Sequence, residues 1–252
     1  MTRVPGLLLL LAALGAAAQP ARRSGFEDMS PQTRAMQRDD AQNPGMLWVQ
    51  DGAALWERAP GPAAASCAGC HGDARVSMRG VAARYPAWDE TLQHPVDLAQ
   101  RINLCRERHQ GATALPVEQQ DLLALESHVA LQSRGLPVAP PADERLQPFR
   151  VRGEAAWRER IGQLNLSCAQ CHDERAGQRL AGSPIPEGHA NGYPLYRLEW
   201  QGLGSLQRRL RNCMTGVRAE PWPAGSAALV ELSLYLAWRD RGMALESPAV
   251  RP

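Results

Sequence analysis

Apolar positions recur at helical spacing in four stretches of the chain, and polar or proline-rich segments separate these stretches. The periodicity predicts helices over residues 46–59, 95–109, 117–134 and 226–241. Gly135 and Gly242 follow the last two stretches, at the position where a helix commonly stops. We therefore expect a mostly α-helical fold with long loops.

Three other stretches lack this periodicity. Residues 72–95 are expected to form a loop, and residues 19–45 are polar and contain three prolines, so we expect an extended leader that wraps a neighbour. Four prolines within residues 137–148 predict a linker. These boundaries predict an N-terminal domain of residues 46–136 and a C-terminal domain of residues 149–252.

The second domain repeats residues of the first at two fixed offsets. An offset of 101 relates Gly52, Trp56 and Cys67 to Gly153, Trp157 and Cys168. An offset of 108 relates Tyr85-Pro86, Leu98, Arg101 and Cys105 to Tyr193-Pro194, Leu206, Arg209 and Cys213. The second half therefore has seven extra residues after its copy of the cysteine motif. We interpret the pattern as a tandem duplication of one small domain.

Each domain carries one Cys-x-x-Cys-His motif, at residues 67–71 and 168–172. The motif is the attachment signature of c-type haem, in which two thiols bond to the haem and the histidine is the proximal iron ligand. It predicts two covalently bound haem c groups, attached through Cys67, Cys70, Cys168 and Cys171, with His71 and His172 as proximal ligands. A zinc site or a redox pair is the alternative. Helix, motif, long loop, ligand segment and final helix follow in the order typical of a single-haem cytochrome c.

The first eighteen residues have the organisation of a secretory signal peptide. Arg3 supplies the positive start, Leu7 to Leu14 form the apolar core, and cleavage is expected after Ala18. The apolar run is short for a transmembrane span, and no other stretch is predicted to cross a membrane. Because c-type haem is attached outside the cytoplasm, we expect a periplasmic protein, with an uncleaved anchor as the alternative.

Charge and residue usage narrow the chemistry. A net charge of +2 gives no electrostatic case for nucleic acid as a partner. All 28 basic residues are arginines, so lysine can be neither a haem ligand nor a catalytic base. Four of the six cysteines belong to the two motifs, which leaves Cys105 and Cys213 in a compartment that favours disulfides.

Each haem iron needs a sixth ligand or an open site. If the domains are duplicates, this ligand recurs at matching positions, and only Cys105 and Cys213 do so at a suitable distance from the proximal histidines. We therefore predict ligand pairs of His71 with Cys105 and of His172 with Cys213. The alternatives are His109 in the first half, Met214 in the second, and a disulfide between the two cysteines.

Arg101 and Arg209 each precede one of these cysteines by four residues, so guanidinium and sulfur share one helical face. A nearby positive charge favours thiolate over thiol. Arg208 and Arg211 add positive charge in the second half, and this charge would suit an anionic substrate that approaches Cys213. A solvated helix face and pairing with haem propionates are the alternatives.

On several stretches the sequence resembles the SoxA family, the dihaem cytochrome subunits of the SoxAX L-cysteine S-thiosulfotransferase of bacterial sulfur oxidation. The resemblance is carried by both haem motifs and by residues 24–27, 43–48, 101–106, 208–213, 231–239 and 246–251. It implies a periplasmic heterodimer with a monohaem cytochrome, SoxX. The implied reaction joins thiosulfate oxidatively to a cysteine of the SoxYZ carrier and passes electrons through haem to an acceptor cytochrome c.

The resemblance also implies roles for individual residues. Cys213 would be both a ligand of the second haem and the active-site residue, Arg209 would lie beside it, and Cys105 would be a plain axial ligand. Because the first motif is intact, the sequence is similar to the dihaem members. Two other functions stay open: a dihaem electron carrier without its own chemistry, and a thiosulfate dehydrogenase that forms tetrathionate. Dependence on a protein thiol acceptor separates them from the transferase.

Overall fold

The computed structural model describes residues 22–252, so the predicted signal peptide lies outside the described residues. The first half contains α1 (Pro31–Arg38), α2 (Gly45–Glu57), α3 (Cys67–His71), α4 (Ala74–Ser77), η1 (Ala82–Arg84), β1 (Ala87–Asp89), β2 (His94–Val96), α5 (Leu98–Cys105), η2 (Arg106–Gln110) and α6 (Gln120–Leu131). The second contains η3 (Glu144–Leu146), α7 (Gln147–Arg158), α8 (Cys168–His172), β3 (Arg179–Leu180), β4 (Ser183–Pro184), β5 (Leu195–Arg197), β6 (Gly202–Gly204), α9 (Leu206–Gly216), α10 (Ala227–Arg239) and β7 (Ala249–Arg251). Among the described residues, no helix has the length and apolar character to cross a membrane.

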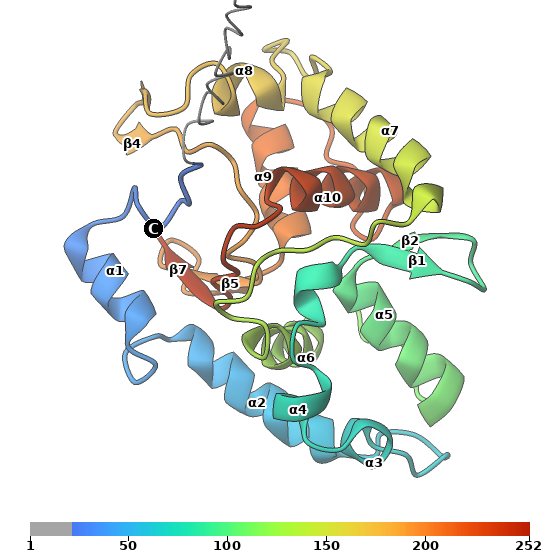
Figure 1. The fold of residues 1–252 in the computed structure, drawn as a ribbon. Helices are drawn as coiled ribbons and strands as arrows, with labels where there is room; N and C mark the ends of the chain where they lie inside the picture. The colour runs from blue at the N-terminus through green and yellow to red at the C-terminus, as the bar shows by residue number, and fades with distance from the viewer. Residues whose placement is uncertain (1–21) are drawn as a thin grey trace, which may run out of the picture.

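The prediction of a mostly α-helical fold is confirmed (Figure 1). The four helices expected from periodicity are present as α2, α5 continued by η2, α6 and α10, with ends shifted by up to three residues. Each half also has its own hydrophobic cluster beside its cysteine motif. Trp56, Leu98 and Val129 belong to the first cluster, and Trp157, Leu229 and Leu232 belong to the second.

In each half, the helix before the cysteine motif crosses the last long helix: α2 packs against α6, and α7 packs against α10. Both crossings depend on a glycine. A Cβ atom at Gly52 would lie 2.1 Å from the carbonyl oxygen of Ala124, and one at Gly153 would lie 2.0 Å from that of Glu231. No side chain fits in such a gap, so only glycine permits this approach. The repeated glycine therefore marks a helix crossing that both halves share.

We expect Gly153→Ala to destabilise the second half by about 1–3 kcal/mol, because the added methyl group forces α7 away from α10. Denaturant unfolding followed by circular dichroism measures the loss. Gly182→Ala is the matched control, since a Cβ at Gly182 would meet no atom within 4 Å. Equal unfolding free energies for the two variants would show that the crossing tolerates a side chain.

A short antiparallel hairpin precedes the helix that carries Cys105 or Cys213, β1 with β2 before α5 and β5 with β6 before α9. The two registers match at an offset of 108, because Ala87 faces Val96 and Leu195 faces Gly204. Helices α5 and α9 then begin at equivalent residues. The duplication inferred from residue spacing is therefore also present in the backbone pairing.

Three expectations about local structure are wrong in detail. Residues 19–45, expected to be extended, contain α1, which begins after an N-cap hydroxyl at Ser30. The expected loop at 72–95 contains α4, η1 and the strand β1. Helix α7 begins at Gln147, inside the expected linker of residues 137–148. Such short elements depend on capping and tertiary contacts, and these leave little trace in apolar periodicity.

The N-terminal segment runs along one side of the molecule, where α1 lies against β7, and β7 pairs in parallel with β5 (Figure 1). The Nδ2 atom of Asn43 donates to the carbonyl oxygen of Pro248 at 2.8 Å. The hydroxyl of Ser24 bonds to Glu246, and the other oxygen of that carboxylate pairs with Arg251 at 2.6 Å. Residues before the first domain therefore stabilise the last strand of the second.

Candidate haem and active site

Each Cys-x-x-Cys-His motif forms a five-residue helix that begins at a serine cap. Ser66 and Ser167 each accept a hydrogen bond from the backbone N–H three residues later. In both motifs the first cysteine is half-buried, while Cys70 is exposed. All six cysteines lie within the described residues and are free thiols, so the alternative of a Cys105–Cys213 disulfide is wrong.

The repeated tryptophan packs on the histidine of the cysteine motif in both halves. The ring centroids of Trp56 and His71 lie 5.8 Å apart, and those of Trp157 and His172 lie 5.6 Å apart. His172 has a second contact, since its Nδ1 atom lies 2.7 Å from the carbonyl oxygen of Pro186 and donates to it. This hydrogen bond leaves Nε2 free to coordinate a metal.

The seven extra residues of the second half explain this support. They bring Pro186 and Gly188 against the histidine, and a Cβ at Gly188 would lie 2.9 Å from the His172 ring and 3.0 Å from that of Trp157. Gly188 has a φ of +75°, a conformation that also favours glycine. Burial lowers the pKa of His172, which favours the neutral form that coordinates metals. Sequence reasoning did not predict these contacts. The one feature of the sequence that points to them is the position of the seven-residue insertion after the second motif.

The predicted sixth ligands lie near the motifs of their own halves. Cys105 ends α5, Cys213 lies in α9, and both are half-buried. Burial raises the pKa of Cys67, and the nearby charge of Cys105 acts in the same direction. Burial likewise raises the pKa of Cys168 to about 11, with a further contribution from Cys213. Each half therefore brings a third sulfur close to its cysteine motif.

The competing ligands have other surroundings. His109 is exposed on η2. Met214 is only 5% exposed and packs in the hydrophobic cluster that contains Trp157. Neither residue has a counterpart of the same type in the other half, which is the property that distinguishes the two cysteines.

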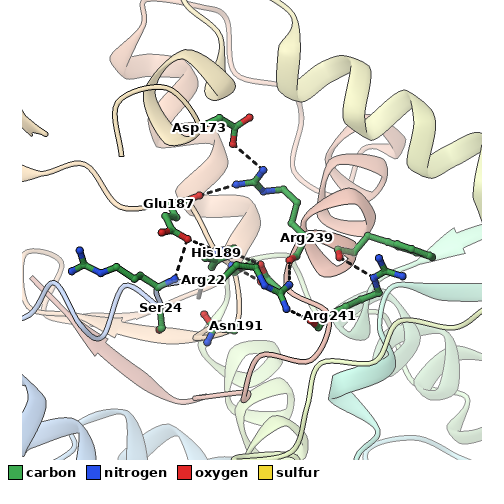
Figure 2. A network of polar contacts seen from close by, with 12 residues as sticks. Arg22, Ser24, Asp173, Glu187, His189, Asn191, Arg239 and Arg241 are labelled. Atoms are coloured by element: carbon green, nitrogen blue, oxygen red, sulfur yellow. Dashed lines mark hydrogen bonds and ion pairs between the residues drawn. The ribbon is translucent and has the colours of Figure 1, made fainter. Parts of the chain in front are cut away.

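A polar network holds the loop that follows the second motif (Figure 2). His189 contacts Asp240 through Nδ1 at 2.6 Å and Glu187 through Nε2 at 3.0 Å. Burial lowers the pKa of His189, but the hydrogen bond and charge of Asp240 outweigh burial and raise the pKa overall. Arg239 pairs with Asp173 at 2.8 Å and donates to the carbonyl oxygen of Glu187 at 3.0 Å. Arg239 thus links the end of the motif to the loop, a role that no sequence pattern indicated.

In the first half, the arginine beside the cysteine is neutralised. Asp89 is 1% exposed, and its carboxylate contacts Arg101 at 2.8 Å and Arg108 at 2.9 Å. Burial raises the pKa of Cys105, and the opposing charges of the two arginines do not reverse the shift. The charge of Arg101 therefore acts in the expected direction, towards the thiolate of Cys105, but burial outweighs it.

In the second half, the three predicted substrate-binding arginines differ in their contacts. The guanidinium of Arg208 stacks on Trp200 at 4.1 Å from the ring centroid. The Nε atom of Arg211 donates to the carbonyl oxygen of Trp222 at 3.0 Å. The half-buried side chain of Arg209 forms no ion pair with any carboxylate in residues 22–252. Arg209 is thus the one member of the set with an uncommitted guanidinium in the described chain.

The structure contains two duplicated helical units. In each unit a capped Cys-x-x-Cys-His helix packs against a tryptophan, which is the arrangement of a two-domain c-type cytochrome. The model of the SoxA/TsdA cytochrome c domain matches residues 51–138 and again residues 152–245. The chain belongs to the SoxA/TsdA family of cytochromes. Domains of this kind carry covalently bound haem c.

Known relatives agree with this assignment. The chain is 38% identical to the L-cysteine S-thiosulfotransferase subunit SoxA of Pseudaminobacter salicylatoxidans, over 90% of this chain and 80% of the relative. It is 35% identical to the subunit of the same name from Rhodovulum sulfidophilum, over 91% and 80% of the two chains. A chain in the crystal structure of SoxXA from P. pantotrophus superposes with a TM-score of 0.88 at 34% identity, covering 92% of this chain and 87% of that one.

Proposed function

We propose that this chain is the dihaem subunit of an L-cysteine S-thiosulfotransferase. Two haem c groups are attached through Cys67, Cys70, Cys168 and Cys171, with His71 and His172 as proximal ligands and Cys105 and Cys213 as sixth ligands. The names of the relatives support the activity. The free thiols and the orientation of His172 by Pro186 support the fit of haem.

One observation carries the assignment of the second half as the reacting half. Arg209 lies four residues before Cys213 and has no carboxylate partner in residues 22–252, whereas its counterpart Arg101 is neutralised by Asp89. A guanidinium fork without an internal anion is suited to bind an external one. Thiosulfate, a dianion, is such a ligand. We therefore assign Cys213 as the reacting sulfur and Arg209 as a substrate-binding residue.

The reaction joins two sulfur atoms, one from a cysteine thiolate and one from thiosulfate, with the loss of two electrons. The Sγ atom of Cys213 bonds to the outer sulfur of thiosulfate, and Arg209 holds the sulfonate end. The thiolate of the carrier protein then attacks that same sulfur and releases the Cys213 thiolate, as in thiol–disulfide exchange. When bound, haem supplies the electron acceptor beside Cys213. Arg208, stacked on Trp200, and Arg211, which donates through Nε to the backbone carbonyl of Trp222, add positive charge that favours binding of the dianion.

The proposal includes the partners of the reaction. A monohaem cytochrome subunit like SoxX completes the enzyme, and the similarity to a chain of SoxXA from P. pantotrophus supports this partner. A sulfur-carrier protein like SoxYZ supplies the acceptor cysteine, and an electron-accepting cytochrome c removes the electrons. We propose a periplasmic location, supported by the signal-peptide pattern of residues 1–18.

A thiosulfate dehydrogenase is the second candidate, because the matching family description names both SoxA and TsdA. An activity assay separates the transferase from the dehydrogenase. It supplies the matured protein and its monohaem partner with thiosulfate, an acceptor cytochrome c and a carrier that has one reactive cysteine. We expect cytochrome reduction only with the free carrier thiol, and a carrier mass increased by one thiosulfate adduct. Alkylated carrier is the control. Tetrathionate formation without carrier would assign a dehydrogenase, and no turnover with any acceptor would assign an electron carrier.

A further inference from the structure

The two hairpins and ligand helices allow a residue-by-residue comparison of the two halves. At the common offset of 108, Arg101 corresponds to Arg209 and Cys105 to Cys213. The last residue of the first hairpin strand is Asp89 in β1 and Arg197 in β5. The duplicated site therefore keeps the arginine and the cysteine but reverses the charge at the equivalent strand position.

In the first half, the residue at this strand position supplies a buried carboxylate, that of Asp89. The carboxylate of Asp89 accepts hydrogen bonds from the backbone N–H groups of Thr91 at 3.0 Å and Leu92 at 2.8 Å. It also accepts ion-pair contacts from Arg101 and Arg108. Every acceptor direction of the buried carboxylate is thus used. In the first half, the carboxylate of Asp89 therefore occupies the place beside the two arginines that an external anion would otherwise take.

In the second half, the same position adds a cation. The side chain of Arg197 is only 13% exposed, and its Nη2 atom contacts the exposed carboxylate of Glu199 at 3.0 Å. Its buried Nε atom has no hydrogen-bond partner among the described residues. The guanidinium lies 5.1 Å from the ring centroid of Trp200, whose other cationic neighbour is Arg208. Trp200 therefore helps to hold Arg197 in a mostly buried position with an unused donor.

The charges of Arg197 and Arg209 converge on the same neighbours. Burial raises the pKa of Tyr193 to about 12, while both guanidinium groups act to lower it and Cys213 acts to raise it. The hydrogen bond from Arg197 lowers the pKa of Glu199, and the charge of Arg209 lowers it further. The register of the two hairpins places Arg197 at the position from which Asp89 contacts Arg101 in the first half, and the charges of Arg197 and Arg209 act on the same two side chains.

We propose that Arg197 is a second substrate-binding residue, and that with Arg209 it holds the sulfonate end of thiosulfate where Asp89 places its carboxylate in the first half. This inference rests on the proposed function and names the residue pair that makes the second half select a dianion. Three sulfonate oxygens can accept from two guanidinium forks at once. Glu199 is the exchangeable partner that thiosulfate displaces, because its carboxylate is largely exposed. Trp200 is a positioning residue.

The test measures thiosulfate dependence in the matured complex with saturating carrier. We expect Arg197→Gln to raise KM for thiosulfate by about tenfold to a hundredfold, with a much smaller change in kcat, because a charge-assisted contact is lost on binding. Glu199→Gln should act in the opposite direction and lower KM by up to about fivefold, since the competing carboxylate is removed. Arg160→Gln is the matched control for net charge, because Arg160 is exposed and contacts only the carbonyl oxygen of Asn165.

The outcomes separate this inference from the proposed function. An unchanged KM in Arg197→Gln, with Cys213→Ala inactive, would overturn the role of Arg197 and leave the transferase in place. Turnover in Cys213→Ala would overturn both. If Arg197→Gln does not mature, Arg197→Lys and Glu199→Gln decide: the inference requires a raised KM in the first and a lowered KM in the second, and any other pair of results contradicts it.

Discussion

Loss of thiosulfate transfer by at least about a thousandfold is the expected result of Cys213→Ala, because the variant lacks the sulfur that we propose bonds to thiosulfate. Both haem groups should stay attached, since the four attachment cysteines are unchanged and lie on α3 and α8. Turnover with saturating thiosulfate and carrier measures the first expectation. The absorbance of haem per chain measures the second. Full activity in this variant would remove Cys213 from the mechanism.

Cys105→Ala is the matched variant, because it removes the equivalent sulfur from the other half. We expect a much smaller loss of turnover, since the arginine beside Cys105 is already neutralised by Asp89. Electron paramagnetic resonance of the oxidised protein adds an independent readout. Two low-spin ferric signals with the narrow g-spread of thiolate ligation are expected, and each variant should lose one of them. Broad signals typical of histidine or methionine ligation would return His109 and Met214 to consideration.

Asp89→Asn should destabilise the first half by about 2–4 kcal/mol at neutral pH, because it leaves the half-buried Arg101 and the more exposed Arg108 without their shared buried carboxylate. Hydrogen bonds from Arg108, with the charges of both arginines, lower the pKa of Asp89 far below its usual range even though burial opposes them. A carboxyl group with a lowered pKa stabilises the fold above its unfolded-state pKa of about 3.9. That stabilisation is lost as the pH falls below about 4.

Unfolding free energies of both proteins between pH 7 and pH 2.5 test this expectation. The difference between wild type and Asp89→Asn should be largest near neutral pH and should shrink below about pH 4. Asp40→Asn is the control, because Asp40 also contacts an arginine, Arg134, at 2.7 Å but is 49% exposed. Its cost should stay below about 1 kcal/mol. Equal costs for the two variants would mean that the buried carboxylate is not the source of stability.

The repeated residue spacing predicted much of the fold and the site. Gly52 and Gly153 mark helix crossings, and Trp56 and Trp157 pack on the histidines that follow the cysteine pairs. Such features are visible in the sequence because a duplicated domain repeats its structural requirements at constant offsets. The short hairpins occur in both halves but share no residue type, and the docked leader occurs once, so neither has a residue pattern that reveals it.

The charges around the two candidate ligand cysteines could not be predicted in the same way. Arg101 and Arg209 have the same register on their helices, yet one is paired with a buried carboxylate and the other is not. Arg208 and Arg211 add positive charge to the same helix as Arg209, and the structure stacks Arg208 on Trp200 and bonds Arg211 to the backbone carbonyl of Trp222. The partner of an arginine depends on side chains from other elements, which helix register does not identify.

The sequence by itself determined the two haem motifs, the duplicated order of elements and the pair of candidate ligand cysteines, because each depends on spacing along one segment. Only the tertiary structure decided which arginine is available for an anion and what orients His172. It also placed Arg197 where the first half has Asp89. These properties depend on which groups meet after folding, because a buried charge takes its chemistry from its neighbours in space.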